Sequence, residues 1–346
     1  MFRPLLILNL MTSSVFAAEN ASLDWKQLQS LPDPLGFAAP FAGVSGGALI
    51  VAGGANFPDK MPWEGGKKVW HDNVWLLKRP NGAWREVGKL PRPLGYGVCV
   101  THRDSVLCVG GSDSERHYAD AFRLTWNGGK LLTETLPSLP TPLSGGSGAL
   151  VNDTLFVACG AEQPGEQSAT NRAFALDLSA SKPAWRELPP LPGKPRMLAA
   201  GSAHGDAFYV IGGVALEANN EGKIARVYLR EAWRYKDGQG WQRIADLPKP
   251  SVAAASPAPV IAGRLLLLGG DDGSRVGFQP LDRHPGFPDA LIAYDVARNV
   301  WREAGNVPAP RATLPCIQWN ERYVLPSGES RPGVRSPEVW SITQRQ

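Results

Sequence analysis

The sequence predicts an all-β fold, a six-bladed kelch-type β-propeller whose last blade is closed by the N-terminal strand. Three observations lead to this prediction. Two short motifs alternate along the chain, and each occurs six times. The two ends of the chain supply complementary parts of one repeat. The 346 residues also include 38 Gly, 31 Pro and 12 Trp, which favours many short strands joined by tight turns.

The first motif is a strand that starts at an aromatic residue and ends in a proline-rich turn. Its copies read DWKQLQSLPDP, AWREVGKLPRP, LLTETLPSLPTP, AWRELPPLPGKP, GWQRIADLPKP and VWREAGNVPAP, and the third of them lacks the tryptophan. The second motif is an apolar strand that ends in a glycine pair. Its copies read ALIVAGG, VLCVGG, LFVACG, FYVIGG, LLLLGG and RYVLPSG, and the third and sixth are weaker versions.

Two further strands complete each repeat. Between the glycine pair and the next tryptophan strand lies an alternating segment, such as DNVWLLKR, RAFALDL, EAWRYKD or ALIAYDV. After the proline-rich turn comes a strand of small residues, such as LGYGVCV, LAAGSAH or SVAAASPA. Four strands therefore recur at intervals of roughly 50 residues, as in kelch blades. The small-residue strand suits the crowded centre of a propeller, and the tryptophan strand suits the rim.

The chain ends predict how the ring closes. After Glu329, the segment PEVWSITQRQ supplies a third strand, and no outer tryptophan strand follows it. The segment LDWKQLQSLP near the N-terminus supplies that missing strand. Such a closure removes free sheet edges. Two separate β-sandwiches, the alternative for a chain of this length, would not explain why the two ends complement each other.

The first residues have the layout of a secretory signal. Arg3 gives a positive end, residues 5–11 form an apolar run, and Val15-Phe16-Ala17 is a small-residue cleavage pattern. We therefore expect residues 1–17 to be a signal peptide and residues 18–346 to form a single propeller domain. The apolar run is too short to span a bilayer. We expect an exported protein, periplasmic or secreted, and the alternative is an uncleaved N-terminal anchor.

The cysteines leave two possibilities open. Cys99 and Cys108 flank a short polar turn, which would place them opposite each other across a hairpin. A cross-strand disulfide is permissible in an exported protein, and two buried free thiols fit the pattern equally well. Cys159 and Cys316 lie far apart and lack the spacing of metal ligands.

Composition and motifs exclude several classes of function. The net charge of +4 is mild, and no basic run interleaved with aromatic residues indicates a nucleic-acid partner. The five histidines are scattered over different repeats without metal-ligand spacing, and no serine or cysteine lies in a nucleophile-elbow motif. We therefore expect no metal and no other cofactor.

Charged residues gather in the loops that share one face of the predicted propeller. Loops from second to third strand, and from outer strand to the next inner strand, surround the mouth of the central channel. They carry Glu162, Asp271, Asp272, Glu329, Arg196 and Arg311. Acids and arginines around a mouth would suit a small, polar, anionic ligand. The alternative is that these are ordinary solvated loop charges.

Two loops resemble a known family. The segment GESRPGVR resembles the active-site loop of the bacterial sialic acid mutarotases (N-acetylneuraminate epimerases), which are exported kelch propellers. There a Gly-Glu pair is followed, six residues after the Glu, by an Arg within a Pro-Gly turn, and these positions are Glu329 and Arg335 here. GGANFPDKMPWEGGKKVWHDNVWLL is similar to the blade that follows. Because that blade comes first in this chain, the order resembles that of the cyclically permuted mutarotases.

The resemblance implies a role for each candidate residue. Mutarotation removes a proton from the anomeric hydroxyl and delivers one to the ring oxygen, which a single carboxylate with a water or second acid can do. Glu329 would be the general base and Arg335 the clamp for the carboxylate of a small acidic sugar. The weaker candidates for substrate binding are Arg196, Arg311 and Arg116 as a second cation, and Asn56 and Lys67 for hydroxyl contacts. For Glu329, the alternative is a salt bridge with Arg331 or Arg335 that stiffens the loop.

Other functions fit the predicted fold, because fold does not fix function. The main alternative is a non-catalytic kelch propeller that presents its loops to a glycan or a protein partner. In that case the charged loops would spread over a flat, aromatic rim instead of converging on one pocket. A lyase or another isomerase acting on acidic sugars would share the pocket and differ in its chemistry.

Overall fold

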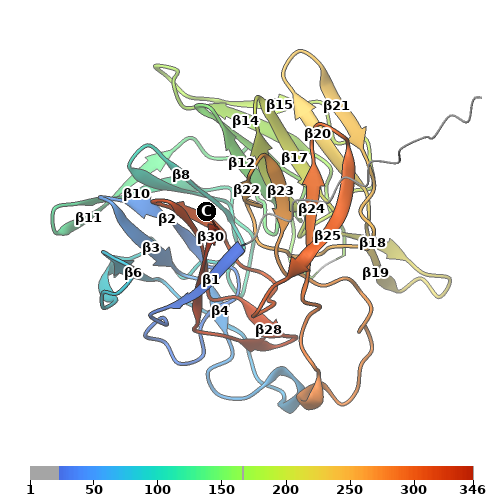
Figure 1. Ribbon diagram of the computed structural model, residues 1–346, viewed down its shortest axis with the longest axis horizontal. Helices are drawn as coiled ribbons and strands as arrows, with labels where there is room; N and C mark the ends of the chain where they lie inside the picture. Colours follow the sequence, from blue (N-terminus) through green and yellow to red (C-terminus); the bar gives the residue numbers. More distant parts are fainter. Residues whose placement is uncertain (1–22, 166, 346) are drawn as a thin grey trace, which may run out of the picture.

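The computed structural model describes residues 23–165 and 167–345, and it confirms the six-bladed propeller (Figure 1). Six four-stranded antiparallel sheets form the blades. Blades 1 to 3 consist of β2 (Phe41–Ser45), β3 (Ala48–Ala52), β6 (Asn73–Leu77) and β7 (Arg85–Lys89); β8 (Val98–His102), β9 (Ser105–Val109), β10 (Ala121–Asn127) and β11 (Lys130–Leu136); β12 (Ser147–Val151), β13 (Thr154–Ala158), β14 (Ala173–Asp177) and β15 (Trp185–Leu188).

The remaining blades follow the same order from the channel to the rim. Blades 4 to 6 consist of β16 (Ala200–His204), β17 (Ala207–Ile211), β20 (Ala232–Lys236) and β21 (Gly240–Ile244); β22 (Val260–Ile261), β23 (Arg264–Leu267), β24 (Ala290–Asp295) and β25 (Val300–Asn306); β26 (Ile317–Trp319), β27 (Arg322–Pro326), β30 (Val339–Gln344) and β1 (Leu23–Leu28).

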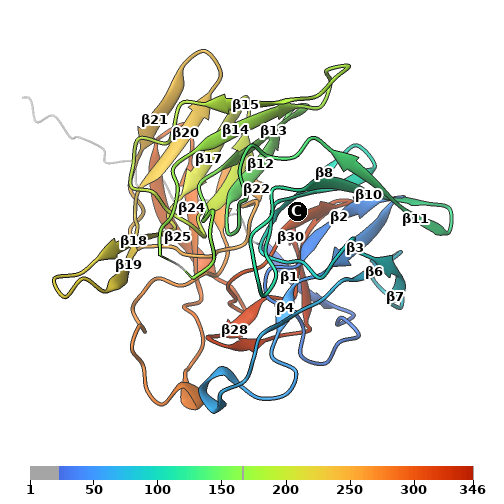
Figure 2. The same ribbon diagram turned by 180° about the vertical axis from the view of Figure 1, so that it is seen from behind.

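Three small hairpins and two short 3₁₀ turns lie in the loops between second and third strands. The hairpins are β4 (Ala55–Asn56) with β5 (Val69–Trp70), β18 (Val214–Ala218) with β19 (Ile224–Tyr228), and β28 (Glu329–Arg331) with β29 (Val334–Arg335). The 3₁₀ turns are η1 (Pro62–Glu64) and η2 (Leu281–Arg283). In both ribbon views β4 and β28 lie side by side (Figures 1 and 2). In the described part of the chain, no helix has the length and apolar character needed to cross a membrane.

The two ends of the described chain close the ring as predicted. The N-terminal β1 pairs antiparallel with β30, from Leu23 opposite Gln344 to Leu28 opposite Val339. Blade 6 therefore contains strands from both ends, and β1 covers the edge of β30 that would otherwise be unpaired. The predicted signal peptide, residues 1–17, lies outside the described residues.

The tryptophans of the first motif join neighbouring blades at the rim. Four indole Nε1–H groups donate to a backbone carbonyl at the end of the preceding blade's outer strand, at distances of 2.7–2.8 Å. The pairs are Trp84 to Gln29, Trp185 to Pro137, Trp241 to Pro189 and Trp301 to Ala245. An indole N–H is a donor only, and a buried one needs an acceptor. This contact explains why the motif recurs, and blade 2, whose copy lacks the tryptophan, has no equivalent residue to make it.

The glycine pair of the second motif permits close backbone contact between blades. In blade 1, Gly53 and Gly54 have φ angles of +64° and +89°. A Cβ atom on Gly53 would lie 2.2 Å from the carbonyl oxygen of Leu94, so a side chain there would clash with the next loop. The Gly54 N–H instead donates to that same oxygen at 2.8 Å. Glycine is required here for both reasons.

Six residues form a closed ring of backbone hydrogen bonds around the channel. Each blade supplies one residue with a positive φ just before its inner strand, and its N–H donates to the carbonyl oxygen of the equivalent residue in the preceding blade at 2.7–3.0 Å. The members are Ala39, Tyr96, Gly145, Leu198, Ala253 and Thr313, with φ angles from +47° to +63°. We call this set the channel ring. A left-handed backbone is unfavourable for residues other than glycine, so the surrounding blades must impose it.

The structure has buried free thiols, and no cross-strand disulfide, at Cys99 and Cys108. Cys99 on β8 and Cys108 on β9 are Cα partners across the hairpin, as expected, but both are free. Burial raises the pKa of the Cys99 thiol to about 11, which keeps it protonated and unreactive near neutral pH. Cys159 and Cys316 are likewise free and buried.

Candidate active site at one mouth of the channel

A cavity of about 390 Å³ opens at the face where the second-to-third-strand loops emerge. Its walls come from the loops of blades 1, 2, 3, 4 and 6, and its floor includes the channel-ring residues Tyr96, Gly145, Leu198 and Thr313. The charged or titratable side chains in its lining are those of Lys68, Asp113, His117, Arg226 and Glu329, together with Tyr96. Loops of five blades therefore converge on one cavity, and of the six loop charges named in the sequence analysis Glu329 alone is among its described lining residues. A larger cavity of about 530 Å³ lies at the other end of the channel, and none of the described residues that line it carries a carboxylate.

Glu329 is held rigidly at this cavity. It begins β28 directly after Gly328, and its backbone exchanges two hydrogen bonds with Ala312, at 2.8 and 2.9 Å. Ala312 precedes Thr313 of the channel ring, so the backbone of Glu329 is fixed relative to the cavity floor. The side chain is 17% exposed, and its Oε1 lies 2.9 Å from Nη2 of Arg335. No other described side chain pairs with this carboxylate.

Arg335 lies behind Glu329 and not in the cavity lining. The two residues are Cα partners across the β28–β29 hairpin. Arg335 Nε donates to the carbonyl oxygen of Ala55 in β4 at 3.2 Å, and its guanidinium lies 4.7 Å from the ring centroid of Phe57. Its Nη1 is buried and has no hydrogen-bond partner among the described residues. In this structure Arg335 positions Glu329, whereas the sequence-based expectation made it a clamp open to the ligand.

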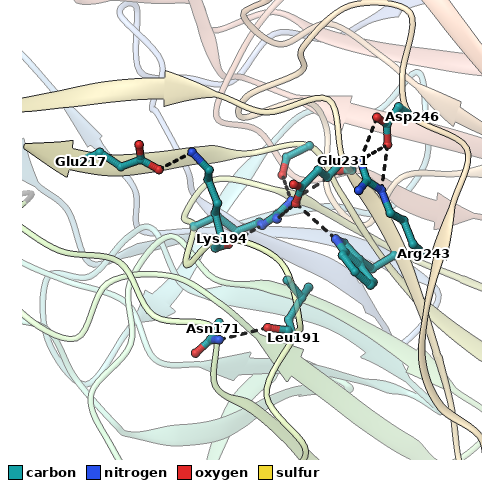
Figure 3. Close-up of polar contacts among 10 residues, drawn as sticks. Asn171, Leu191, Lys194, Glu217, Glu231, Arg243 and Asp246 are labelled. Carbon is teal, nitrogen blue, oxygen red and sulfur yellow. Dashed lines mark hydrogen bonds and ion pairs between the residues drawn. The ribbon is translucent and has the colours of Figure 1, made fainter. Parts of the chain in front are cut away.

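The structure does not bring Arg196 or Arg311 to the cavity. Arg196 is fully buried inside blade 4, where Nη2 pairs with Glu231 and Nη1 donates to the carbonyl oxygen of Gly212 at 3.1 Å. Figure 3 shows Glu231 within this network, beside the separate pairs Lys194–Glu217 and Arg243–Asp246. Arg311 is its counterpart in blade 6, with Nη2 2.5 Å from Glu338.

Burial lowers the pKa of Arg311 to about 10, and Glu338 opposes that shift, so the guanidinium stays charged at neutral pH. Both arginines occupy the same place in their repeats, each facing an acid that directly precedes the third strand. Their partners and burial give them a structural role inside the blades.

The remaining predicted residues, Arg116, Asn56 and Lys67, are not among the described residues that line the cavity. Arg116 is exposed and stacks on Tyr118, with its guanidinium 5.0 Å from the ring centroid. Asn56 is buried, and its Oδ1 accepts a hydrogen bond from Nε2 of His71 at 2.8 Å, so it joins elements of blade 1. Lys67 is exposed and does not line the cavity.

The lining side chains that escaped the sequence-based prediction include Lys68, Trp70, Tyr96 and His117. The ammonium of Lys68 lies over two rings, 5.3 Å from the centroid of Trp70 and 5.0 Å from that of Tyr96. The sequence contained a signal for Lys68 and Trp70, because side chains alternate between two faces along the short strand β5 and the residue before it. In the stretch KKVW, Lys68 and Trp70 are two residues apart and share a face, whereas Lys67 and Val69 share the exposed one.

His117 and Asp113 add polar groups to the wall contributed by blade 2. Nδ1 of His117 lies 3.0 Å from the carbonyl oxygen of Ala161. A carbonyl oxygen only accepts, so Nδ1 carries the proton and Nε2 is the acceptor of the neutral ring. Burial lowers the pKa of His117, which favours that neutral form. Burial alone would raise the pKa of Asp113, but hydrogen bonds from Tyr118 and two backbone N–H groups outweigh it and lower the pKa.

The site thus combines a fixed carboxylate, a neutral imidazole and a lysine cation around a water-accessible cavity. This arrangement can move a proton to or from a hydroxyl group and can bind an anion beside it. In the described residues, no group of three or more His, Cys, Asp or Glu side chains is arranged to hold a metal ion.

Known proteins resemble the chain in both sequence and fold. A family profile described as "NANM: N-acetylneuraminate epimerase" matches residues 8–133 and 136–275. A solved structure titled "Structure of YjhT" superposes with a TM-score of 0.65 over 91% of this chain and 97% of that one, at 15% identity, a level that shows a common fold alone.

Curated relatives named N-acetylneuraminate epimerase match over a shorter stretch. The protein of Haemophilus influenzae strain PittEE is 36% identical over 127 residues, which are 32% of this chain and 33% of the relative. That of Salmonella arizonae is 38% identical over 132 residues, 34% of each chain. The chain therefore aligns with about a third of the length of these relatives. Because the family profile covers well over half of the chain, the chain belongs to the N-acetylneuraminate epimerase family.

Proposed function

We propose that the protein interconverts the anomers of N-acetylneuraminate, or of a closely related acidic sugar, with Glu329 as the general base. The position of Glu329 carries this proposal: its carboxylate lines the 390 Å³ cavity while its backbone is bonded to Ala312 beside the channel ring. The cavity falls within the range of about 300–1,000 Å³ that is usual for small-ligand sites. A general base must be held in place, and this one is held by both backbone and side chain.

The proposed reaction is a proton transfer in each direction. Glu329 takes the proton of the anomeric hydroxyl while the bond between anomeric carbon and ring oxygen breaks, and the ring oxygen takes a proton from a water or a second acid. The open keto form turns its carbonyl group, and the reverse steps close the ring on the other face. The sugar is neither oxidised nor reduced in these steps, and no co-reactant is consumed. A carboxylate in a water-accessible cavity is sufficient for this chemistry.

Arg335 has a supporting task in this proposal. Its guanidinium fixes one carboxylate oxygen of Glu329 and is itself held by Ala55 and Phe57. To clamp a substrate carboxylate, as the family resemblance implied, it would have to leave that buried position. In this proposal Arg335 orients the base Glu329, and another residue binds the carboxylate of the sugar.

Two further expectations remain proposals. We propose that the blades are circularly permuted relative to the curated relatives. The family match ends at residue 275, while the loop that resembles the family's active-site loop lies at residues 326–335, which is consistent with permutation. We also propose export to the periplasm with removal of residues 1–17. N-terminal sequencing of the protein from a periplasmic extract tests the cleavage site, and a start at Met1 would contradict it.

The convergence of the loops favours a small-molecule enzyme over a non-catalytic binding module. Five blades contribute to one cavity that contains both carboxylates and cations. A glycan- or protein-binding rim would instead be broad and flat. Another isomerase or a lyase acting on acidic sugars would use the same cavity, and product analysis distinguishes these reactions from mutarotation.

Anomeric exchange measured by NMR tests the proposal. The wild-type protein should increase the exchange rate between the two anomers of N-acetylneuraminate above the spontaneous rate. Glu329→Gln should lower the protein-dependent rate by roughly 10²- to 10⁴-fold, the usual contribution of a general base. Glu162→Gln is the matched control, because Glu162 is also a loop acid but pairs with Arg172 and does not line the cavity. Wild-type exchange in the Glu329→Gln variant would refute the assignment.

A further inference from the structure

We infer that Lys68 is the residue that binds the carboxylate of the substrate and so selects acidic sugars. This inference rests on the proposed function, because it names the recognition group of the same cavity. It departs from the sequence-based expectation, which assigned that task to arginines. Of those arginines, Arg335, Arg196 and Arg311 are buried against other partners, and Arg116 lies exposed at the rim.

The charges in the cavity lining point to Lys68. Among the described lining residues, the two carboxylates already have partners: Asp113 accepts hydrogen bonds from Tyr118 and from two backbone N–H groups, and Glu329 pairs with Arg335. Lys68 forms no ion pair with any described residue, and its ammonium contacts aromatic rings instead. Arg226 also lines the cavity and has interactions of its own within the protein. Lys68 is therefore a cation in the cavity wall whose charge no described carboxylate neutralises.

The two rings hold the ammonium where an anion can reach it. Trp70 and Tyr96 both line the cavity, and their centroids lie 5.3 and 5.0 Å from Nζ. A cation over a ring face is attracted by the ring quadrupole, which restricts a side chain that would otherwise be mobile. An ammonium has three N–H donors, so ring contacts leave donors for a ligand oxygen.

The position of Lys68 relative to Glu329 also fits a 2-keto sugar acid. In such a sugar the carboxylate is bonded to the anomeric carbon, so the base for the anomeric hydroxyl and the cation for the carboxylate must lie close together. Glu329 is joined through Arg335 to the carbonyl of Ala55, and Ala55 is the Cα partner of Trp70, two residues after Lys68. The contact between the β28–β29 and β4–β5 hairpins of adjacent blades thus links the segments that carry the base and the cation. Both ribbon views show β28 beside β4 (Figures 1 and 2).

The test compares an acidic sugar with its neutral counterpart. Equilibrium binding and exchange kinetics are measured with N-acetylneuraminate and with its methyl ester, for the wild type, Lys68→Met, Lys68→Arg and Lys67→Met. Lys67 is the matched control because it is the adjacent lysine, exposed and outside the cavity lining. Lys68→Met should weaken binding of the acid by roughly 10- to 100-fold, the range for a charged hydrogen bond. It should leave binding of the ester within about threefold of wild type, because the ester has no carboxylate for Lys68 to bind.

The remaining variants separate charge from structure. Lys68→Arg keeps the charge and should retain the preference for the acid, and Lys67→Met should behave as wild type. An unchanged ratio of acid to ester binding in Lys68→Met would overturn the role of Lys68, and exchange catalysis by the wild type would then still stand. If the wild type binds the acid without accelerating exchange, the proposed reaction fails, while loss of acid binding in Lys68→Met still supports the inference. Absence of acid binding by the wild type would overturn both.

Discussion

Replacing Arg196 by methionine tests whether the buried arginines act inside the blades or on a ligand. Arg196 is fully buried, and its guanidinium pairs with Glu231 and donates to the carbonyl oxygens of Lys194 and Gly212. Methionine retains much of the apolar volume but leaves Glu231 without its cation. We therefore expect a loss of stability and no specific loss of ligand affinity.

The structure sets the size of the effect. Removing one partner of a buried ion pair costs about 3–5 kcal/mol, because the other charge remains in a poorly solvated position. The Glu231 side chain is 23% exposed, so water relieves part of this penalty. We expect a loss near the lower end, about 3 kcal/mol. At roughly 2 °C per kcal/mol for a large domain, the midpoint of thermal unfolding should fall by about 6 °C.

Two variants control for the interpretation. Arg196→Met combined with Glu231→Leu should recover most of the lost stability, because the stranded charge is removed together with its partner. Arg243→Met breaks an exposed pair with Asp246, whose side chains are 52% and 41% exposed, and should cost less than about 1 kcal/mol. Thermal unfolding followed by tryptophan fluorescence measures all three. A variant Arg196→Met that unfolds like wild type but binds the acidic sugar tenfold more weakly would refute the structural assignment.

Two further predictions concern the thiols and the pH dependence of stability. Dithiothreitol should leave the unfolding midpoint unchanged, because Cys99 and Cys108 are free; a lower midpoint under reducing conditions would indicate a bridge. Stability should fall as the pH drops below the ordinary histidine pKa of 6.5, because burial lowers the pKa of His71 and of His117, so the unfolded chain binds protons that the folded chain does not. Denaturant titrations at pH 7.5 and 5.0 should show a smaller decline in His117→Gln, and an equal decline would contradict this account.

The architecture was predictable because its pattern repeats. A tryptophan at the rim donates a hydrogen bond to the neighbouring blade, and a glycine pair allows two loops to approach closely. Both contacts recur from blade to blade, so the residues that make them recur at fixed intervals along the chain. The channel ring was not predictable, since the residues that adopt the left-handed backbone, such as Tyr96 and Leu198, have nothing in common chemically. Their conformation comes from the blades around them and from the carbonyl that each one meets.

The site was predictable in part. Glu329 follows an apolar strand and lies in a loop of known type, and the structure places it at the cavity. The sequence-based prediction put Arg196 and Arg311 at the mouth of the channel, whereas both are buried inside their blades. A loop position does not reveal whether a side chain turns toward the channel or into the blade. A signal was nevertheless present in the sequence: where the loop before the inner strand carries Arg196 or Arg311, the residue directly before the third strand is Glu231 or Glu338. Such paired occurrence within one repeat predicts an internal ion pair.

The asymmetry of the site arises from loops attached to equivalent points of a symmetric scaffold. In every blade the residue after the glycine turn forms a backbone bridge beside the channel ring, and these six residues are Ala55, Ser112, Ala161, Val214, Asp271 and Glu329. The two that are acids differ in what holds the carboxylate. The carboxylate of Asp271 accepts hydrogen bonds from the hydroxyl of Tyr228 at 2.7 Å and the N–H of Gly273 at 2.9 Å, and it does not line the cavity.

Glu329 has one extra methylene and an arginine behind it, and its carboxylate lines the cavity. The carboxylate of Asp271 accepts a hydrogen bond on each oxygen, from a hydroxyl and from an amide, whereas Arg335 pairs with one oxygen of Glu329. Equivalent backbone positions can therefore place an acid bonded within its own loops in blade 5 and the proposed base in blade 6. The difference lies in the β28–β29 hairpin, which carries its own cation and docks on β4 of blade 1. That docking brings Lys68 and Glu329 to one cavity, so the two ends of the chain that close the ring also assemble the site.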